Sequence, residues 1–201
     1  MAITTEQIKA LREKTGAGIL DCRKALEQAN GDFNSALEFL REKGLATAAK
    51  RADRVASEGM VELYSHGNGR VGVMVEVNCE TDFVARSEAF RKFAHELALQ
   101  IAANAPRYMR PEDIPAEVIE KEKEEARIRA RAEGKNENLL DRIAEGRLEK
   151  FLDEACLLRQ IYIRDETITV EKLLLQNIAA IGENILIRRF VRWELGESAE
   201  S

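Results

Sequence analysis

The strongest constraint on the fold is a strict alternation of valine with other residues across positions 71–77. Successive side chains of a strand point to opposite faces of its sheet, so the valines must share one buried face. A turn sequence, His66-Gly67-Asn68-Gly69, comes directly before them, and a second extended segment, residues 59–65, comes before the turn. The pattern therefore predicts a β-hairpin with one buried face.

Before the hairpin, apolar residues follow the spacing of short helices. Thr4 and Gln7 form a capping-box pattern at the first helix, Asp32 is placed to cap the third, and Gly44 is expected to close it. Residues 1–45 are therefore predicted to form a three-helix bundle of the ubiquitin-associated type, a small module that binds another protein. Residues 46–57, rich in Ala, Lys and Arg, are expected to form a basic helical linker.

After the linker, residues 58–201 are predicted to form one core domain. A helix over residues 90–103 is expected to cover the β-hairpin, and two antiparallel helices within about residues 115–155 form a helical hairpin. A last helix, which Thr169 can cap, leads to a terminal strand on which Ile185, Ile187, Val191 and Trp193 alternate. The predicted fold is α+β: the helical bundle, an antiparallel three-stranded sheet with covering helices, and a protruding helical hairpin.

The composition favours a protein partner over a nucleic acid or a membrane. The formal net charge is −5 and the isoelectric point about 5.4, so no positive field would attract DNA, RNA or anionic lipid. Aromatic residues make up only 5% of the chain, which argues against a base-stacking surface. The N-terminus has no basic segment followed by an apolar run, and no stretch approaches the roughly 20 apolar residues of a membrane span. A cytosolic location is therefore expected.

No pattern for covalent chemistry or a cofactor accompanies these elements. Cys22, Cys79 and Cys156 stand at wide spacing, which is typical of buried reduced thiols rather than of a disulfide framework or a metal site. The Gly-rich turn joins two strands, whereas a phosphate-binding loop lies between a strand and a helix. We therefore expect neither an enzyme nor a bound metal or cofactor.

Two segments carry residues that are unusual for their place. The first is the corner between the first two helices, where the adjacent Ile19 and Leu20 cannot both face a small core. Either one of them packs inward and the other is an ordinary exposed apolar residue, or the pair contacts a partner. In the second case Arg12 is near enough to pair with a carboxylate of that partner.

The second segment, residues 78–90, connects the valine strand to the following helix. Phe83 is either a buried anchor or an exposed aromatic wedge beside the Asp82 carboxylate, as in interface hot spots. Asp82 or Ser87 is placed to cap the helix. Spacing alone leaves these alternatives open.

Both segments resemble signature stretches of the elongation factor Ts family. The similar stretches are LREKTGAGILDCRKAL, VNCETDFVAR, GRLEKFLDEACLLRQ and GENILIRRFVRWELGE, in order along nearly the whole chain. The resemblance implies a guanine-nucleotide exchange factor of translation elongation that binds elongation factor Tu with its GDP and promotes GDP release. The implied partner contacts are Arg12, Ile19 and Leu20, and the residues implied to disturb the partner's magnesium and phosphate site are Thr81, Asp82, Phe83 and Val84.

The chain looks like a short form of the family with a single core subdomain. A second core half is then expected from another copy of the chain, in a homodimer whose sheets pack together. The alternating side chains of the terminal strand are a candidate surface, and burial under the chain's own helices is the alternative.

Two other functions stay open from the residues alone. One is a ubiquitin-like-binding or scaffold protein that binds its partner without an effect on nucleotide. The other is an RNA-binding module that uses Lys50, Arg51, Arg54 and the strand from Arg188 to Arg192. The acidic net charge and the few aromatic residues disfavour it.

Overall fold

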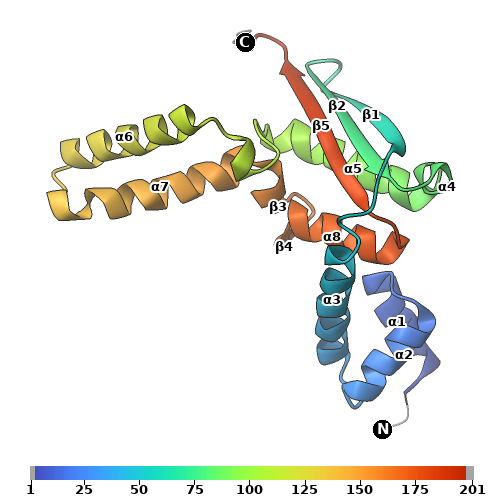
Figure 1. The fold of residues 1–201 in the computed structure, drawn as a ribbon. Helices are drawn as coiled ribbons and strands as arrows, with labels where there is room; N and C mark the ends of the chain where they lie inside the picture. Colours follow the sequence, from blue (N-terminus) through green and yellow to red (C-terminus); the bar gives the residue numbers. More distant parts are fainter. Residues whose placement is uncertain (1–2, 198–201) are drawn as a thin grey trace. The chain divides into compact units, whose positions relative to one another are not determined.

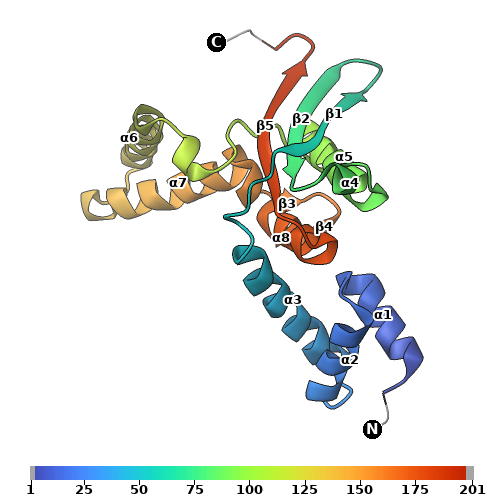
Figure 2. The same ribbon diagram turned by 45° about the vertical axis from the view of Figure 1, so that its right-hand side comes forward.

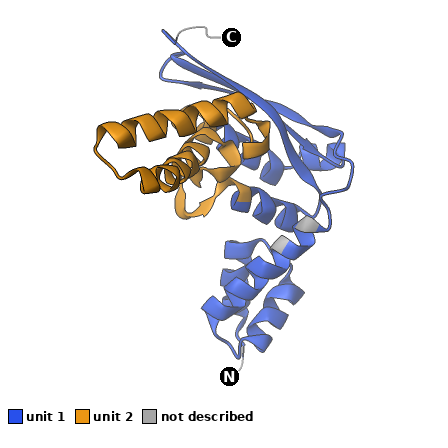
Figure 3. Cartoon of the chain, turned by 60° about the vertical axis from the view of Figure 1, so that its left-hand side comes forward, with its two compact units in different colours: residues 1–98, 172–201 blue, residues 99–171 orange. Residues whose placement is uncertain are grey.

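The computed structural model describes residues 3–197, apart from the side chains of Leu45 and Ala49. It has two compact units, one of residues 1–98 with 172–201 and the other of residues 99–171 (Figure 3). The first unit contains the N-terminal helices and the main sheet, and the second contains a pair of long helices. The predicted domains, residues 1–45, 46–57 and 58–201, rest on sequence pattern, whereas the two units rest on compactness. The division into these domains stays a prediction.

Three helices form the N-terminal part: α1 (Thr5–Thr15), α2 (Ile19–Gln28) and α3 (Phe33–Ala49). The predicted caps are confirmed, because Thr4 and Gln7 form a reciprocal capping box and the Asp32 side chain accepts from the backbone of Ser35. The helices share a small core of fully or nearly buried side chains, which are Leu11, Cys22, Ala25, Leu26, Ala36 and Leu40. This core explains why three helices of such modest length are stable together.

Helix α3 continues past Gly44 to Ala49, so the predicted helix end at Gly44 is wrong. A single glycine costs a helix only about 1 kcal/mol, and the residues that follow it favour helix. The glycine has a packing role, because a Cβ at this position would lie 3.2 Å from the Cβ of Ala179. The predicted helical linker is also wrong in part, since residues 50–54 form turns and residues 55–57 have no regular structure.

The main sheet has three antiparallel strands in the order β1-β2-β5, with β1 (Glu58–His66), β2 (Val71–Cys79) and β5 (Ile185–Glu194) (Figure 1). The valine face of β2 is buried, which confirms the prediction from the alternation. Helix α5 (Glu88–Asn104) lies against this face, and its His95 is bonded through Nδ1 to the Glu62 carboxylate of β1 at 2.8 Å. The small α4 (Asp82–Ala85) lies between β2 and α5 in the chain.

A β-bulge in strand β5 reverses the face of the sheet to which its alternating side chains point. Glu76 pairs with Arg189 and Val77 pairs with Ile187, so Arg188 is the extra residue. Ile185 and Ile187 are therefore buried, whereas Val191 and Trp193 are exposed on the other face. The prediction that these four side chains share one face is wrong, because one inserted residue reverses the alternation beyond it.

The second unit contains α6 (Ala116–Ala132) and α7 (Leu140–Ala155), which lie side by side and run in opposite directions in Figures 1 and 2. Short 3-10 turns at Pro111–Asp113, Glu137–Leu139 and Leu157–Arg159 accompany them. Ile114, Leu152 and Cys156 form a buried apolar cluster in this unit. A two-stranded sheet of β3 (Ile161–Tyr162) and β4 (Asp165–Thr169), which the sequence did not predict, precedes α8 (Val170–Ile181).

Across residues 3–197, no helix is long and apolar enough to cross a membrane. In the same part of the chain, no group of three or more His, Cys, Asp or Glu side chains is arranged to hold a metal ion. Cys22, Cys79 and Cys156 are buried and free, as predicted.

Candidate functional site

Residues 81–84 form a short exposed tip where β2 leads into α4. The Phe83 side chain is 82% exposed, so the alternative of a buried anchor is wrong. Asp82 is also exposed, and its carboxylate pairs with the Arg86 guanidinium at 3.1 Å. The structure thus places an aromatic ring and a carboxylate next to each other at the surface.

The cap of α4 is Thr81 rather than Asp82. The Thr81 hydroxyl accepts from the backbone N–H of Val84 at 3.3 Å, and its backbone is extended as an N-cap requires. Ser87 caps the next helix, since its hydroxyl accepts from the backbone N–H of Phe90 at 3.3 Å. Of the two predicted caps, Ser87 is confirmed and Asp82 is wrong. This shift by one residue leaves the Asp82 carboxylate outside the helix cap.

A buried thiol lies directly behind the tip. The Cys79 side chain is fully buried, and this burial, with a smaller contribution from the Glu183 carboxylate, raises the pKa of the thiol to about 11. The thiol is therefore neutral near pH 7, and its Sγ donates to the carbonyl of Thr81 across 3.2 Å. Cys79 thus helps to hold the backbone of the tip and is not a nucleophile.

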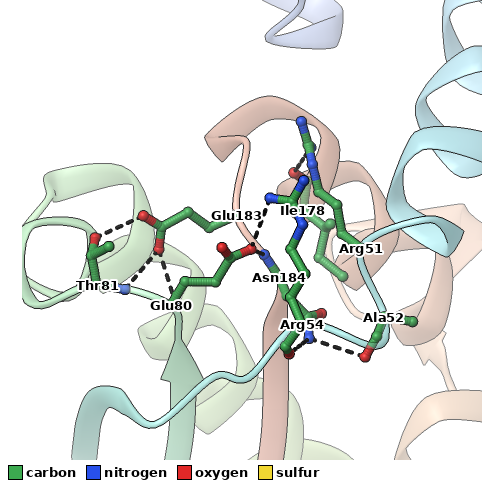
Figure 4. A network of polar contacts seen from close by, with 8 residues as sticks. All are labelled: Arg51, Ala52, Arg54, Glu80, Thr81, Ile178, Glu183 and Asn184. Carbon is green, nitrogen blue, oxygen red and sulfur yellow. Dashed lines mark hydrogen bonds and ion pairs between the residues drawn. The ribbon is translucent and has the colours of Figure 1, made fainter.

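Two glutamates join the tip to the segment that precedes β5 (Figure 4). The Glu183 carboxylate accepts from the backbone N–H groups of Glu80 and Thr81, each at 3.1 Å, and from the Thr81 hydroxyl at 2.7 Å. The Glu80 carboxylate accepts from the backbone N–H of Asn184 at 2.6 Å. We call these four residues the clasp. Sequence analysis missed Glu183 and Asn184, because about a hundred residues separate them from the tip and no local pattern connects the two segments.

The second predicted set, Arg12, Ile19 and Leu20, lies at the corner between α1 and α2. Helix α1 ends at Gly16, which has a left-handed backbone with φ of 66°, and α2 begins at Ile19. Ile19 is 57% exposed and Leu20 is 72% exposed, so neither packs into the small core. Arg12 is exposed as well. The seven predicted residues therefore form two sets, three at this corner and four at the tip.

One face of the main sheet is apolar and uncovered in the single chain. The exposed side chains on this open face are Val61, Leu63, Met74, Val191 and Trp193. Cross-strand pairing brings Met74 opposite both Leu63 and Val191, so the side chains form one patch. Beside the patch, the Glu76 carboxylate pairs with the Arg189 guanidinium at 2.7 Å.

Exposed apolar side chains in three places, on units that bury their own cores, are typical of a factor that acts through contact with other proteins. The chain belongs to the elongation factor Ts family, because the family model described as "Elongation factor TS" matches residues 20–197. Members of this family are guanine-nucleotide exchange factors of translation elongation, and this chain has that role.

Relatives named elongation factor Ts match this chain over nearly its full length. The protein of Carboxydothermus hydrogenoformans is 60% identical over 97% of this chain and 90% of its own length. That of Caldanaerobacter subterraneus subsp. tengcongensis is 60% identical over 98% of this chain and 99% of its own length. The relative from Moorella thermoacetica is 57% identical, with 97% of this chain and 96% of its own length covered. These relatives share the short length of this chain.

Proposed function

We propose that this chain binds elongation factor Tu in its GDP form and speeds GDP release through the tip at Phe83. The observation that supports this proposal most strongly is the 82% exposure of Phe83 on a helix whose backbone is held by the clasp. A large aromatic side chain that is exposed on an anchored scaffold is well suited to insert between elements of a partner. The exchange requires no covalent chemistry from this chain.

The proposed mechanism couples two binding events. Phe83 inserts between helices of the partner, and the Asp82 carboxylate helps to displace the groups that hold magnesium. Thr81 and Val84 complete the tip by fixing the short helix through its cap. Loss of the cation leaves the phosphate charges of GDP unscreened, so GDP leaves and GTP can bind.

Linkage sets the size of the coupling that this mechanism requires. The factor and the nucleotide must weaken each other's affinity by equal factors. A thousandfold loss of GDP affinity corresponds to about 4 kcal/mol. Burial of one aromatic side chain in the complex, together with the lost metal contacts, supplies a free energy of this size.

In the same proposal, the N-terminal helices are a module of the ubiquitin-associated type that docks on the GTP-binding domain of the partner. Ile19 and Leu20 provide an exposed apolar contact, and Arg12 pairs with a carboxylate. Residues 58–201 form the core domain, with α6 and α7 as its helical hairpin and residues 46–57 as the connection. The exchange takes place in the cytoplasm, where translation elongation occurs.

The experiment that tests the proposed function is release of a fluorescent GDP analogue from purified elongation factor Tu. We expect a release rate that rises with the concentration of this protein and then saturates. No acceleration at any concentration would contradict the proposal and would favour a scaffold protein that binds without an effect on nucleotide.

We also propose that the open face of the sheet pairs with the same face of a second copy. Among the residues that the structure describes, the main sheet has three strands and exposed apolar side chains on one face, and a second copy would cover this face. A face rich in apolar side chains is suited to a two-fold contact with the same face of a second copy. Glu76 and Arg189 lie beside this face, so in such a contact Glu76 of each copy would face Arg189 of the other.

Replacing Trp193 with aspartate is expected to weaken this dimer about tenfold, because a carboxylate would lose its hydration in an apolar contact. Trp193 is 76% exposed in the single chain, so the change should leave the fold intact. Sedimentation velocity over a range of concentrations measures the dissociation constant, with Val55→Asp as the control because Val55 lies outside the open face. A wild-type protein that stays monomeric at high concentration would contradict the dimer.

A further inference from the structure

The clasp is a reciprocal exchange of hydrogen bonds between two backbone segments (Figure 4). Glu183, from the turn between α8 and β5, accepts from two backbone N–H groups at residues 80 and 81. Glu80, from the end of β2, accepts in return from the backbone N–H of Asn184. Hydrogen bonds to an ionised acceptor are stronger than neutral ones, so the two carboxylates hold the segments firmly.

The short helix that carries Phe83 depends on the bonds at its first residues, which come from the clasp and from the Cys79 thiol. Helix α4 has four residues, none of them buried. A helix of this length is unstable in isolation, so its orientation depends on what holds its first residues. Thr81 is the residue that joins the clasp to the helix, because its hydroxyl donates to Glu183 and accepts from the N–H of Val84.

The same turn also holds the segment that follows α3. The Asn184 side chain donates to the backbone carbonyls of Ala52 and Arg54, at 3.2 and 2.8 Å. The Arg54 guanidinium in turn lies 3.4 Å from the Glu80 carboxylate. Asn184 is 7% exposed, so these bonds are largely protected from water. Asn184 therefore joins the clasp to the segment that follows α3.

We infer that Glu183 is a positioning residue for nucleotide exchange, which acts through Thr81 to hold Phe83 in the orientation that the partner requires. This inference rests on the proposed function of the tip. Glu183 accepts from the backbone N–H groups of Glu80 and Thr81 and from the Thr81 hydroxyl, so we assign it a role within this chain and not a contact with the partner. Its loss should therefore lower the rate of the exchange step more than it weakens docking, which we assign to Arg12, Ile19 and Leu20.

The test compares Glu183→Ala with the parent in release of fluorescent GDP from elongation factor Tu. We expect the maximal release rate to fall about tenfold, because several charge-assisted bonds to the tip are lost. The half-saturating concentration should change less than twofold. Glu183→Gln should retain an intermediate rate, since its amide oxygen can still accept from the backbone, and it carries the test if the alanine variant does not fold.

A double variant separates positioning from a general structural effect. If Glu183 acts only by positioning Phe83, Glu183→Ala should have no further effect on the maximal rate in a Phe83→Ala background. Glu62→Ala is the matched control, because the partly buried Glu62 carboxylate of β1 binds His95 of α5 without a bond to the tip. This variant should release GDP at the rate of the parent.

The outcomes distinguish the inference from the proposed function. A parent that does not accelerate GDP release contradicts the proposed function itself. If the parent is active and Phe83→Ala is slow, a Glu183→Ala variant at the parental rate overturns the positioning role alone. A further fall of the rate in the double variant also overturns it, because the effect would then not pass through Phe83.

Discussion

Replacing Phe83 with alanine is expected to slow GDP release from elongation factor Tu about 100-fold, which corresponds to about 2.7 kcal/mol. The expected loss is large because Phe83 is the one large apolar side chain of the tip, and the proposed mechanism places it inside the partner. The folded state should be almost unaffected, since the side chain is 82% exposed and its removal leaves no internal cavity.

The measurement is the maximal rate of release of a fluorescent GDP analogue at saturating factor, with the half-saturating concentration from the same titration. Val55→Ala is a matched control, because Val55 is 80% exposed and belongs to none of the proposed contact sets. Unfolding curves of parent and variants show whether any loss comes from the fold. A Phe83→Ala variant that releases GDP as fast as the parent would rule out the wedge.

Much of the scaffold follows from local patterns in the sequence. The alternation of valine in β2 predicts a strand of the hairpin, because every second side chain of a strand points to the same face of its sheet and here that face is buried. The caps at Thr4 and Asp32 were predicted because a side-chain acceptor at a helix start satisfies N–H groups that have no other partner. These features depend on residues within a few positions of one another.

The features that the sequence did not predict depend on distant contacts. The bulge at Arg188 reverses the pattern of β5, and nothing in the alternation of Ile185 to Trp193 reveals an inserted residue. Gly44 lies within helix α3 and not at its end, and the Ala179 side chain that packs against it comes from a distant part of the chain. The clasp likewise joins residues that are far apart in sequence.

The sequence predicted the residues of the tip and of the N-terminal corner but left the exposure of their side chains open, and the reason is physical. Phe83 stands in a segment whose spacing fits both a buried anchor and an exposed wedge, so only the structure could show its exposure. At the N-terminal corner, the size of the core already excluded burial of both Ile19 and Leu20. The structure goes further, since it exposes both side chains.

Replacing Gly59 with alanine is expected to destabilise the fold by about 3 kcal/mol or more. Gly59 has a φ of +146°, which L-residues rarely adopt, and it pairs with Asn78 in the main sheet. An added Cβ would lie 2.1 Å from the carbonyl oxygen of Val77 and 2.7 Å from the Cα of Asn78. Both are backbone atoms of the central strand, so relief requires that β1 and β2 move apart.

Gly72→Ala provides the matched control within the same hairpin. A Cβ at Gly72 would meet no atom within 4 Å, and alanine is expected to change the free energy of unfolding by less than about 1 kcal/mol. Urea unfolding followed by circular dichroism measures both variants against the parent. Because β2 ends at Cys79 and leads directly into Glu80 and the tip, the Gly59→Ala variant, with its loosened hairpin, should also release GDP from the partner more slowly than the parent does. Equal stability of the two variants would show that the hairpin adapts to a side chain at residue 59, and that the close approach of β1 to β2 is not required for the fold.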